Sequence, residues 1–107
     1  MPLNKQLVTK QEIFERIQEN KTQIRALGVK KIGLFGSFLR SQQTASSDVD
    51  FLVEFDEGGK SFDHFMELSF LLEDLFDLPI ELVTLESLSP YIGPLILNEV
   101  EYVSIAA

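Results

Sequence analysis

The chain has 107 residues, a mass of 12.1 kDa and a formal net charge of −8, from 9 Lys and Arg against 17 Asp and Glu. This length fits one folded domain, and an apolar fraction of 45% with nine Phe supplies a packed core. We therefore expect a single domain over residues 1–107, and the composition argues against a disordered chain. The lack of cysteine excludes disulfides, thiol nucleophiles and thiolate zinc sites.

The composition also limits the location and the partners of the protein. No apolar run approaches the roughly 18 residues that a membrane-spanning helix needs, and no basic segment precedes an apolar one as in a secretory signal. We expect a cytoplasmic protein with no membrane partner. The net charge of −8 opposes direct nucleic-acid binding, which depends on Lys and Arg neutralising phosphates. Any phosphate that this protein handles is expected to arrive with metal ions.

Hydrophobic periodicity and helix-breaking residues predict the order helix, strand, strand, helix, strand, helix, strand. Thr9 and Glu12 have the spacing of a capping box at a helix start, and Gly28 offers a stop. The expected ranges are 9–27, 31–35, 48–55, 61–76, 80–84, a short helix after Ser89 that Gly93-Pro94 interrupts, and an edge strand near 102–105. This pattern predicts an α+β fold with a small mixed β-sheet and helices packed mainly on one face.

The predicted strand 48–55 places acidic side chains together. Its alternation puts Val49, Phe51, Val53 and Phe55 on one face and both Asp48 and Asp50 on the other. Two such carboxylates raise each other's pKa unless a cation neutralises them. If the strand 80–84 lies alongside, Glu81 completes a cluster of oxygen ligands suited to Mg²⁺. Two such ions can activate an attacking oxygen and stabilise a leaving one in phosphoryl transfer.

A second group of residues precedes these carboxylates in the chain. Gly36 and Ser37 lie where a strand turns toward a helical segment, so their backbone N–H groups and the Ser37 hydroxyl can bind an anion. Arg40 can add a guanidinium to the same phosphate. Taken alone, Gly-Ser is a simple turn and Asp-x-Asp a solvated strand face. Their order, a phosphate-binding turn followed by paired carboxylates, favours phosphoryl transfer.

These segments resemble the minimal nucleotidyltransferases of the DNA polymerase β superfamily. The resemblance rests on GLFGSFLR at 33–40 and SDVDFLVEF at 47–55, in which ten residues separate Gly36-Ser37 from Asp48-x-Asp50. It continues through LPIELVTLESLSPYIGPLILNEV at 78–100, which resembles the family's third-carboxylate strand and the helix after it. The similarity thus covers most of the chain from about residue 31.

The resemblance implies an enzyme that transfers a nucleotide, most often AMP from ATP, with Mg²⁺. It implies that Asp48 and Asp50 are catalytic metal ligands and that Glu81 is a third ligand or the base for the acceptor hydroxyl. Relatives more often have Asp at the position of Glu81. Gly36, Ser37 and Arg40 would bind the phosphates of the nucleotide.

Stand-alone proteins of this size resemble the antitoxins of HEPN/minimal-nucleotidyltransferase systems, which transfer AMP to a tyrosine hydroxyl of a HEPN ribonuclease toxin. Because 107 residues leave no separate acceptor-binding domain, we expect the acceptor on a partner protein. Two alternatives stay open: an antitoxin that neutralises its toxin by binding alone, and transfer to a small molecule. The helix 61–76 is apolar nearly all round, so we expect part of it to contact the partner.

Overall fold

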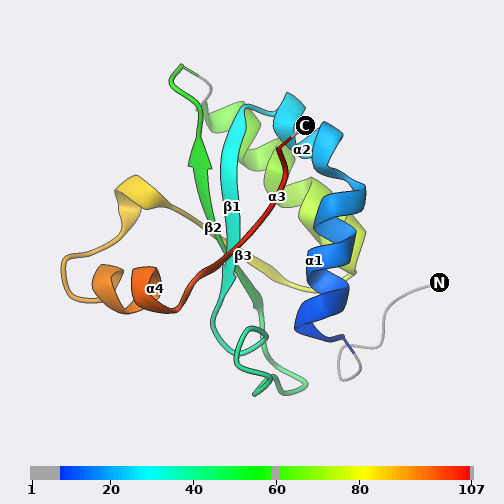
Figure 1. The fold of residues 1–107 in the computed structure, drawn as a ribbon, viewed down its shortest axis with the longest axis vertical. Helices are drawn as coiled ribbons and strands as arrows, with labels where there is room; N and C mark the ends of the chain where they lie inside the picture. The colour runs from blue at the N-terminus through cyan, green and yellow to red at the C-terminus, as the bar shows by residue number, and fades with distance from the viewer. Residues whose placement is uncertain (1–7, 59–60, 107) are drawn as a thin grey trace.

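The computed structural model describes residues 8–58 and 61–106. Its helices and strands follow the predicted order, with one additional helix near the start and a short 3-10 turn before the last helix (Figure 1). In chain order they are α1 (Lys10–Glu19), α2 (Lys21–Ala26), β1 (Val29–Phe35), β2 (Val49–Phe55), α3 (Phe62–Phe76), β3 (Ile80–Thr84), η2 (Leu85–Ser87), α4 (Gly93–Glu99) and β4 (Glu101–Val103).

The four strands form one mixed sheet in the order β3-β2-β1-β4. Strand β1 is antiparallel to both β2 and β4, whereas β2 and β3 are parallel. The register pairs Phe35 with Asp50, and Asp50 in turn with Glu81. The sheet therefore brings the predicted second and third strands side by side, as the carboxylate argument requires.

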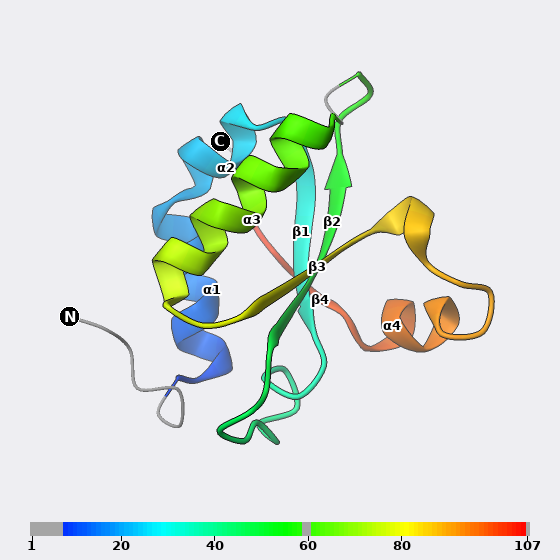
Figure 2. The ribbon, with the colours of Figure 1, turned by 180° about the vertical axis from the view of Figure 1, so that it is seen from behind.

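Helices α1, α2 and α3 cover one face of the sheet, while α4 lies on the other side (Figures 1 and 2). The alternation of β2 explains this layering, because Phe51 and Val53 are fully buried toward the three helices. The Phe51 ring packs 5.9 Å from the Phe76 ring of α3, measured between centroids. The prediction of an α+β fold with helices mainly on one face is confirmed.

Two predicted helices differ from the observed ones. The expected helix 9–27 is two helices that meet at Asn20, whose side-chain amide donates to the Arg16 carbonyl at 2.8 Å and so replaces the next helical hydrogen bond. The expected interruption at Gly93-Pro94 is wrong, because α4 begins there. Proline in a first turn has no N–H to leave unpaired and a backbone angle suited to a helix.

The predicted helix starts are confirmed by their side-chain caps. The Thr9 hydroxyl accepts from the Glu12 N–H at 3.2 Å, and the Ser61 hydroxyl accepts from the His64 N–H at 3.0 Å. At its other end α3 stops at Asp77, which adopts a left-handed conformation with φ 52°. Among the residues that the structure describes, no helix is both long and apolar enough to cross a membrane.

Candidate active site

The predicted phosphate-binding turn follows β1 directly. Gly36 has φ +82°, a left-handed conformation that favours glycine, and it turns the chain away from the sheet. The turn closes on itself where the Arg40 N–H donates to the Gly36 carbonyl at 3.2 Å and the Gln42 N–H donates to the Ser37 carbonyl at 2.9 Å. Phe38 is fully buried and anchors the turn in the core. Ser37 is half-buried within it.

The turn and the carboxylate strand approach each other very closely. A Cβ atom placed on Gly36 would lie 2.1 Å from the Asp50 Oδ2 atom, well inside van der Waals contact. The backbone angle therefore favours glycine here, and any larger residue would also force the Asp50 side chain to move. The result is that the turn after β1 lies directly against an acidic side chain of β2.

Asp50 is the most electrostatically perturbed of the predicted site residues. Burial, followed by the negative charges of Glu81 and Asp48, raises its pKa from an ordinary value of 3.8 to about 6, although Arg40 acts in the opposite direction. Glu81 is the direct neighbour of Asp50 in the β2 and β3 register. Asp48 immediately precedes β2 and is exposed. Like charges thus gather on the open face of the sheet.

The chemistry of these side chains fits a divalent cation. Asp48, Asp50 and Glu81 offer hard oxygen donors, and both burial and the charges of Glu81 and Asp48 disfavour the ionised form of Asp50, which a bound cation would favour. Within 8–58 and 61–106, however, no three acidic or histidine side chains are gathered closely enough to hold a metal ion. The structure therefore brings Asp50 and Glu81 together by register and leaves the predicted cluster of three unassembled.

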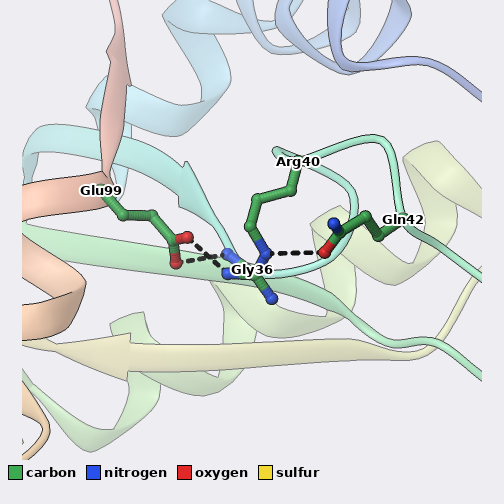
Figure 3. A network of polar contacts seen from close by, with 4 residues as sticks. All are labelled: Gly36, Arg40, Gln42 and Glu99. Carbon is green, nitrogen blue, oxygen red and sulfur yellow. Dashed lines mark hydrogen bonds and ion pairs between the residues drawn. The ribbon is translucent and has the colours of Figure 1, made fainter.

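A fourth acid, Glu99, completes the polar network at this point (Figure 3). Its Oε2 atom accepts from the Gly36 N–H at 3.0 Å, and its Oε1 atom is paired with the Arg40 guanidinium. Arg40 Nε also donates to the Gln42 side-chain oxygen at 3.2 Å. Partial burial acts to raise the pKa of Glu99, but the Gly36 N–H and the Arg40 charge outweigh it and lower the pKa.

Glu99 was not among the site residues predicted from the sequence. It is the last residue of α4 and its partner Gly36 lies 63 positions earlier, so no local spacing connects them. Only the pairing of β4 with β1 brings the end of α4 to the end of β1. The single available signal was its place in the segment 78–100 that carries the family resemblance.

The site is an open surface and does not coincide with a deep cavity. A shallow pocket of about 370 Å³ lies at the opposite end of β1, where Val29, Lys30 and Lys31 line it together with the chain after β4. It contains none of the predicted site residues. We assign the candidate site by its chemistry, because Asp50, its neighbour Glu81 and the predicted phosphate-binding turn all lie at the Gly36 end of β1.

Comparison with protein families gives a match to the nucleotidyltransferase domain over residues 10–103. The protein adenylyltransferase MntA of Thermococcus cleftensis is 40% identical over 98 residues, covering 91% of this chain and 98% of that protein. A candidate protein adenylyltransferase of Methanocaldococcus jannaschii is 39% identical over 98 residues, covering 89% of this chain and 98% of its own length.

Solved structures share the fold. A candidate minimal nucleotidyltransferase superposes with a TM-score of 0.67 at 25% identity, covering 82% of this chain and 93% of that one. A toxin–antitoxin complex with AMP-PNP gives 0.61 at 24% identity, with 79% and 73% covered. The tri-AMPylated Shewanella oneidensis HEPN toxin in complex with its MNT antitoxin gives 0.54 at 22% identity, with 81% and 71% covered.

Proposed function

The chain belongs to the nucleotidyltransferase family, and we propose that it transfers AMP from ATP, with Mg²⁺, to a tyrosine hydroxyl of a HEPN-type toxin. In this proposal the chain is the antitoxin of that ribonuclease. The whole of residues 1–107 acts as one catalytic domain in the cytoplasm, where ATP is available, and nucleic acid is not a direct partner. The observation that carries the proposal is the contact of Gly36 with Asp50 at the point where β3 adds Glu81.

The proposal gives the two sides of this contact different tasks. Gly36, Ser37 and Arg40 bind the triphosphate through backbone N–H groups, a hydroxyl and a guanidinium. Asp48, Asp50 and Glu81 would hold Mg²⁺, which when bound supplies positive charge against the phosphates. Support for the second task comes from the raised pKa of Asp50, which is caused first by burial and then by repulsion from Glu81 and Asp48. A bound nucleotide would then lie across the open face of the sheet between β1 and β3.

The transfer itself is a substitution at phosphorus. The acceptor oxygen bonds to the α-phosphorus as the bond from that phosphorus to the bridging oxygen breaks, so that pyrophosphate leaves and AMP remains on the acceptor. The proton of the acceptor hydroxyl passes to a carboxylate, and Glu81 is our candidate because it is exposed beside Asp50. The other site residues position the nucleotide and stabilise charge, which is most of the work in phosphoryl transfer.

The choice of a protein acceptor is supported by the relatives. Two proteins about 40% identical over almost their full length carry the name protein adenylyltransferase. Structures with the same fold include an antitoxin bound to an AMPylated HEPN toxin and a toxin–antitoxin pair with an ATP analogue. The exposed apolar side chains Phe62 and Phe70 of α3 offer a surface to such a partner.

The test uses as the acceptor a candidate HEPN-type partner, which we expect to be encoded beside this gene. We expect its intact mass to increase by one or more AMP units when it is incubated with this chain, ATP and Mg²⁺. The double variant Asp48→Asn/Asp50→Asn should abolish the increase, because both carboxylates lose their charge. Glu57→Gln, an exposed acid on the loop after β2, is the matched control and should retain it.

Each alternative gives a different result in the same experiment. No mass increase, together with a tight complex and a silenced ribonuclease, would mean that the chain neutralises its toxin by binding alone. Transfer of AMP to a small hydroxyl compound without any partner would indicate a small-molecule enzyme. An undiminished mass increase with the double variant would refute the assignment of Asp48 and Asp50.

A further inference from the structure

We infer that Glu99 is an internal competitor for the nucleotide, whose carboxylate occupies the phosphate-binding position at Gly36 and Arg40 and must leave when ATP binds. This inference rests on the proposed function, since it takes the turn after β1 as the site for the phosphates. It concerns a residue to which neither the sequence pattern nor the proposed chemistry gives a role. Glu99 therefore sets how tightly the site binds its nucleotide.

The geometry of Glu99 is that of an anion bound at two points. One carboxylate oxygen accepts from the Gly36 N–H at 3.0 Å, and the other is paired with Arg40 (Figure 3). A phosphate would use the same two donors, because a backbone N–H at a strand end and a guanidinium fork are both anion ligands. The carboxylate thus reproduces two of the contacts expected of a bound phosphate.

The two anions cannot share these donors. Gly36 has a single N–H, and the Asp50 carboxylate already lies against Gly36 on one side, where a Cβ atom would come within 2.1 Å of Oδ2. A phosphate at Gly36 would also meet the negative charge of Glu99 at contact distance. Repulsion and loss of the donor both require that Glu99 withdraws before the phosphate is bound.

Withdrawal of Glu99 needs no unfolding. Its side chain is 25% exposed, and that of Arg40 is 49% exposed, so both can turn toward solvent. Glu99 is the half-buried last residue of α4, and the neighbouring Leu97 and Asn98 are exposed. The displaced carboxylate would regain water in exchange for its two protein contacts. The free energy lost on displacement therefore subtracts directly from the affinity for ATP.

The experiment measures ATP binding by titration calorimetry in the presence of Mg²⁺ and without any partner. Glu99→Gln removes the charge while keeping the shape, and we expect ATP to bind about tenfold more tightly, since a charge-assisted contact is replaced by a neutral one. Glu101→Gln is the matched control, because it removes the same charge two residues away, where Glu101 is paired with Lys10 at 2.9 Å. The control should change the affinity by less than about twofold.

A second measurement uses the unaltered protein and so does not depend on how the variant folds. When ATP is added, the NMR signals of the Gly36 amide and of the Glu99 carboxyl carbon should shift together and saturate at the same concentration. A Gly36 amide that responds while the Glu99 carboxyl does not would overturn the inference. So would an affinity of Glu99→Gln equal to or weaker than that of the unaltered protein.

These outcomes are separable from those of the proposed function. Tighter ATP binding by Glu99→Gln without AMP transfer to any acceptor would support the internal competitor and refute the transferase activity. AMP transfer with no effect of Glu99→Gln on ATP affinity would support the transferase activity and refute the internal competitor. Absence of ATP binding by both proteins would refute a phosphate site at Gly36 and with it the inference.

Discussion

Replacing Asp50 by Asn should stabilise the folded protein while it removes the proposed activity. In the fold the pKa of Asp50 is raised from an ordinary value of 3.8 to about 6, chiefly by burial and by the charge of Glu81. A difference of two pH units corresponds to ~3 kcal/mol between the charged and neutral forms. Because solvent reaches this half-buried side chain, we expect about 1–2 kcal/mol of stabilisation in the Asn variant at neutral pH.

The pH dependence follows from the direction of the shift. A carboxyl whose pKa is raised by folding holds its proton more tightly in the folded state, so its contribution destabilises the fold progressively as pH rises from about 4 to above 6. Asp50→Asn should therefore be more stable than the unaltered protein near pH 8 and nearly equal to it near about pH 4. Urea unfolding at both pH values, without Mg²⁺, measures the difference in unfolding free energy between Asp50→Asn and the unaltered protein.

The matched control for this prediction is Glu57→Gln, which makes the same change in net charge at an exposed position. It should alter the free energy of unfolding by less than about 0.5 kcal/mol at either pH. Equal stability of Asp50→Asn and the unaltered protein at high pH would refute the reasoning. A stabilisation of the same size from Glu57→Gln would instead assign the effect to the overall charge of −8.

Three further predictions concern the turn and the helix surface. Gly36→Ala should destabilise the protein by at least about 2 kcal/mol more than Gly58→Ala in urea unfolding, since both have a positive φ but only a Cβ on Gly36 meets another atom within 4 Å. Equal destabilisation by the two variants would show that the Asp50 carboxylate moves aside without a measurable cost in free energy. Phe38→Ala should lower the unfolding free energy by about 3–4 kcal/mol, because a fully buried ring is lost under the turn. Thermal and urea denaturation measure this change, and a value below about 1 kcal/mol would contradict the anchoring role of Phe38. Phe70 is 56% exposed, and Phe70→Glu should weaken partner binding at least about tenfold in titration calorimetry while the stability of the chain stays unchanged. Unchanged partner binding would exclude this part of α3 from the interface.

The sequence was informative where the structure depends on neighbours along the chain. Alternation in the strand 48–55 identified its buried face, and hydroxyl residues at Thr9 and Ser61 marked two helix starts. The proximity of Asp50 and Glu81 could be anticipated only on the condition that their strands are adjacent. The parallel pairing of β2 with β3 meets that condition.

What could not be predicted depends on contacts between distant parts of the chain or on a choice between local conformations. Asn20 can continue a helix or end one. Here it ends α1, because its side-chain amide donates a hydrogen bond to the Arg16 carbonyl of the preceding turn. Pro94 can interrupt a helix or begin one, and in the fold it lies in the first turn of α4. Glu99 reaches Gly36 only because β4 joins the sheet at β1, which no periodicity of α4 encodes.

The shortness of β4 has a consequence for local unfolding. This edge strand has three residues and pairs with Ile32, Gly33 and Leu34 of β1. Beyond this pairing it is held by the ion pair of Glu101 with Lys10 and by the buried side chain of Val103. Edge elements with few hydrogen bonds open at a lower free energy than the centre of a sheet, so β4 should detach as a separate cooperative unit. Because Glu99 lies two residues before β4, each detachment would also carry its carboxylate away from Gly36. Hydrogen exchange of the Tyr102 and Val103 amides would then report how often the turn after β1 is left without its internal anion.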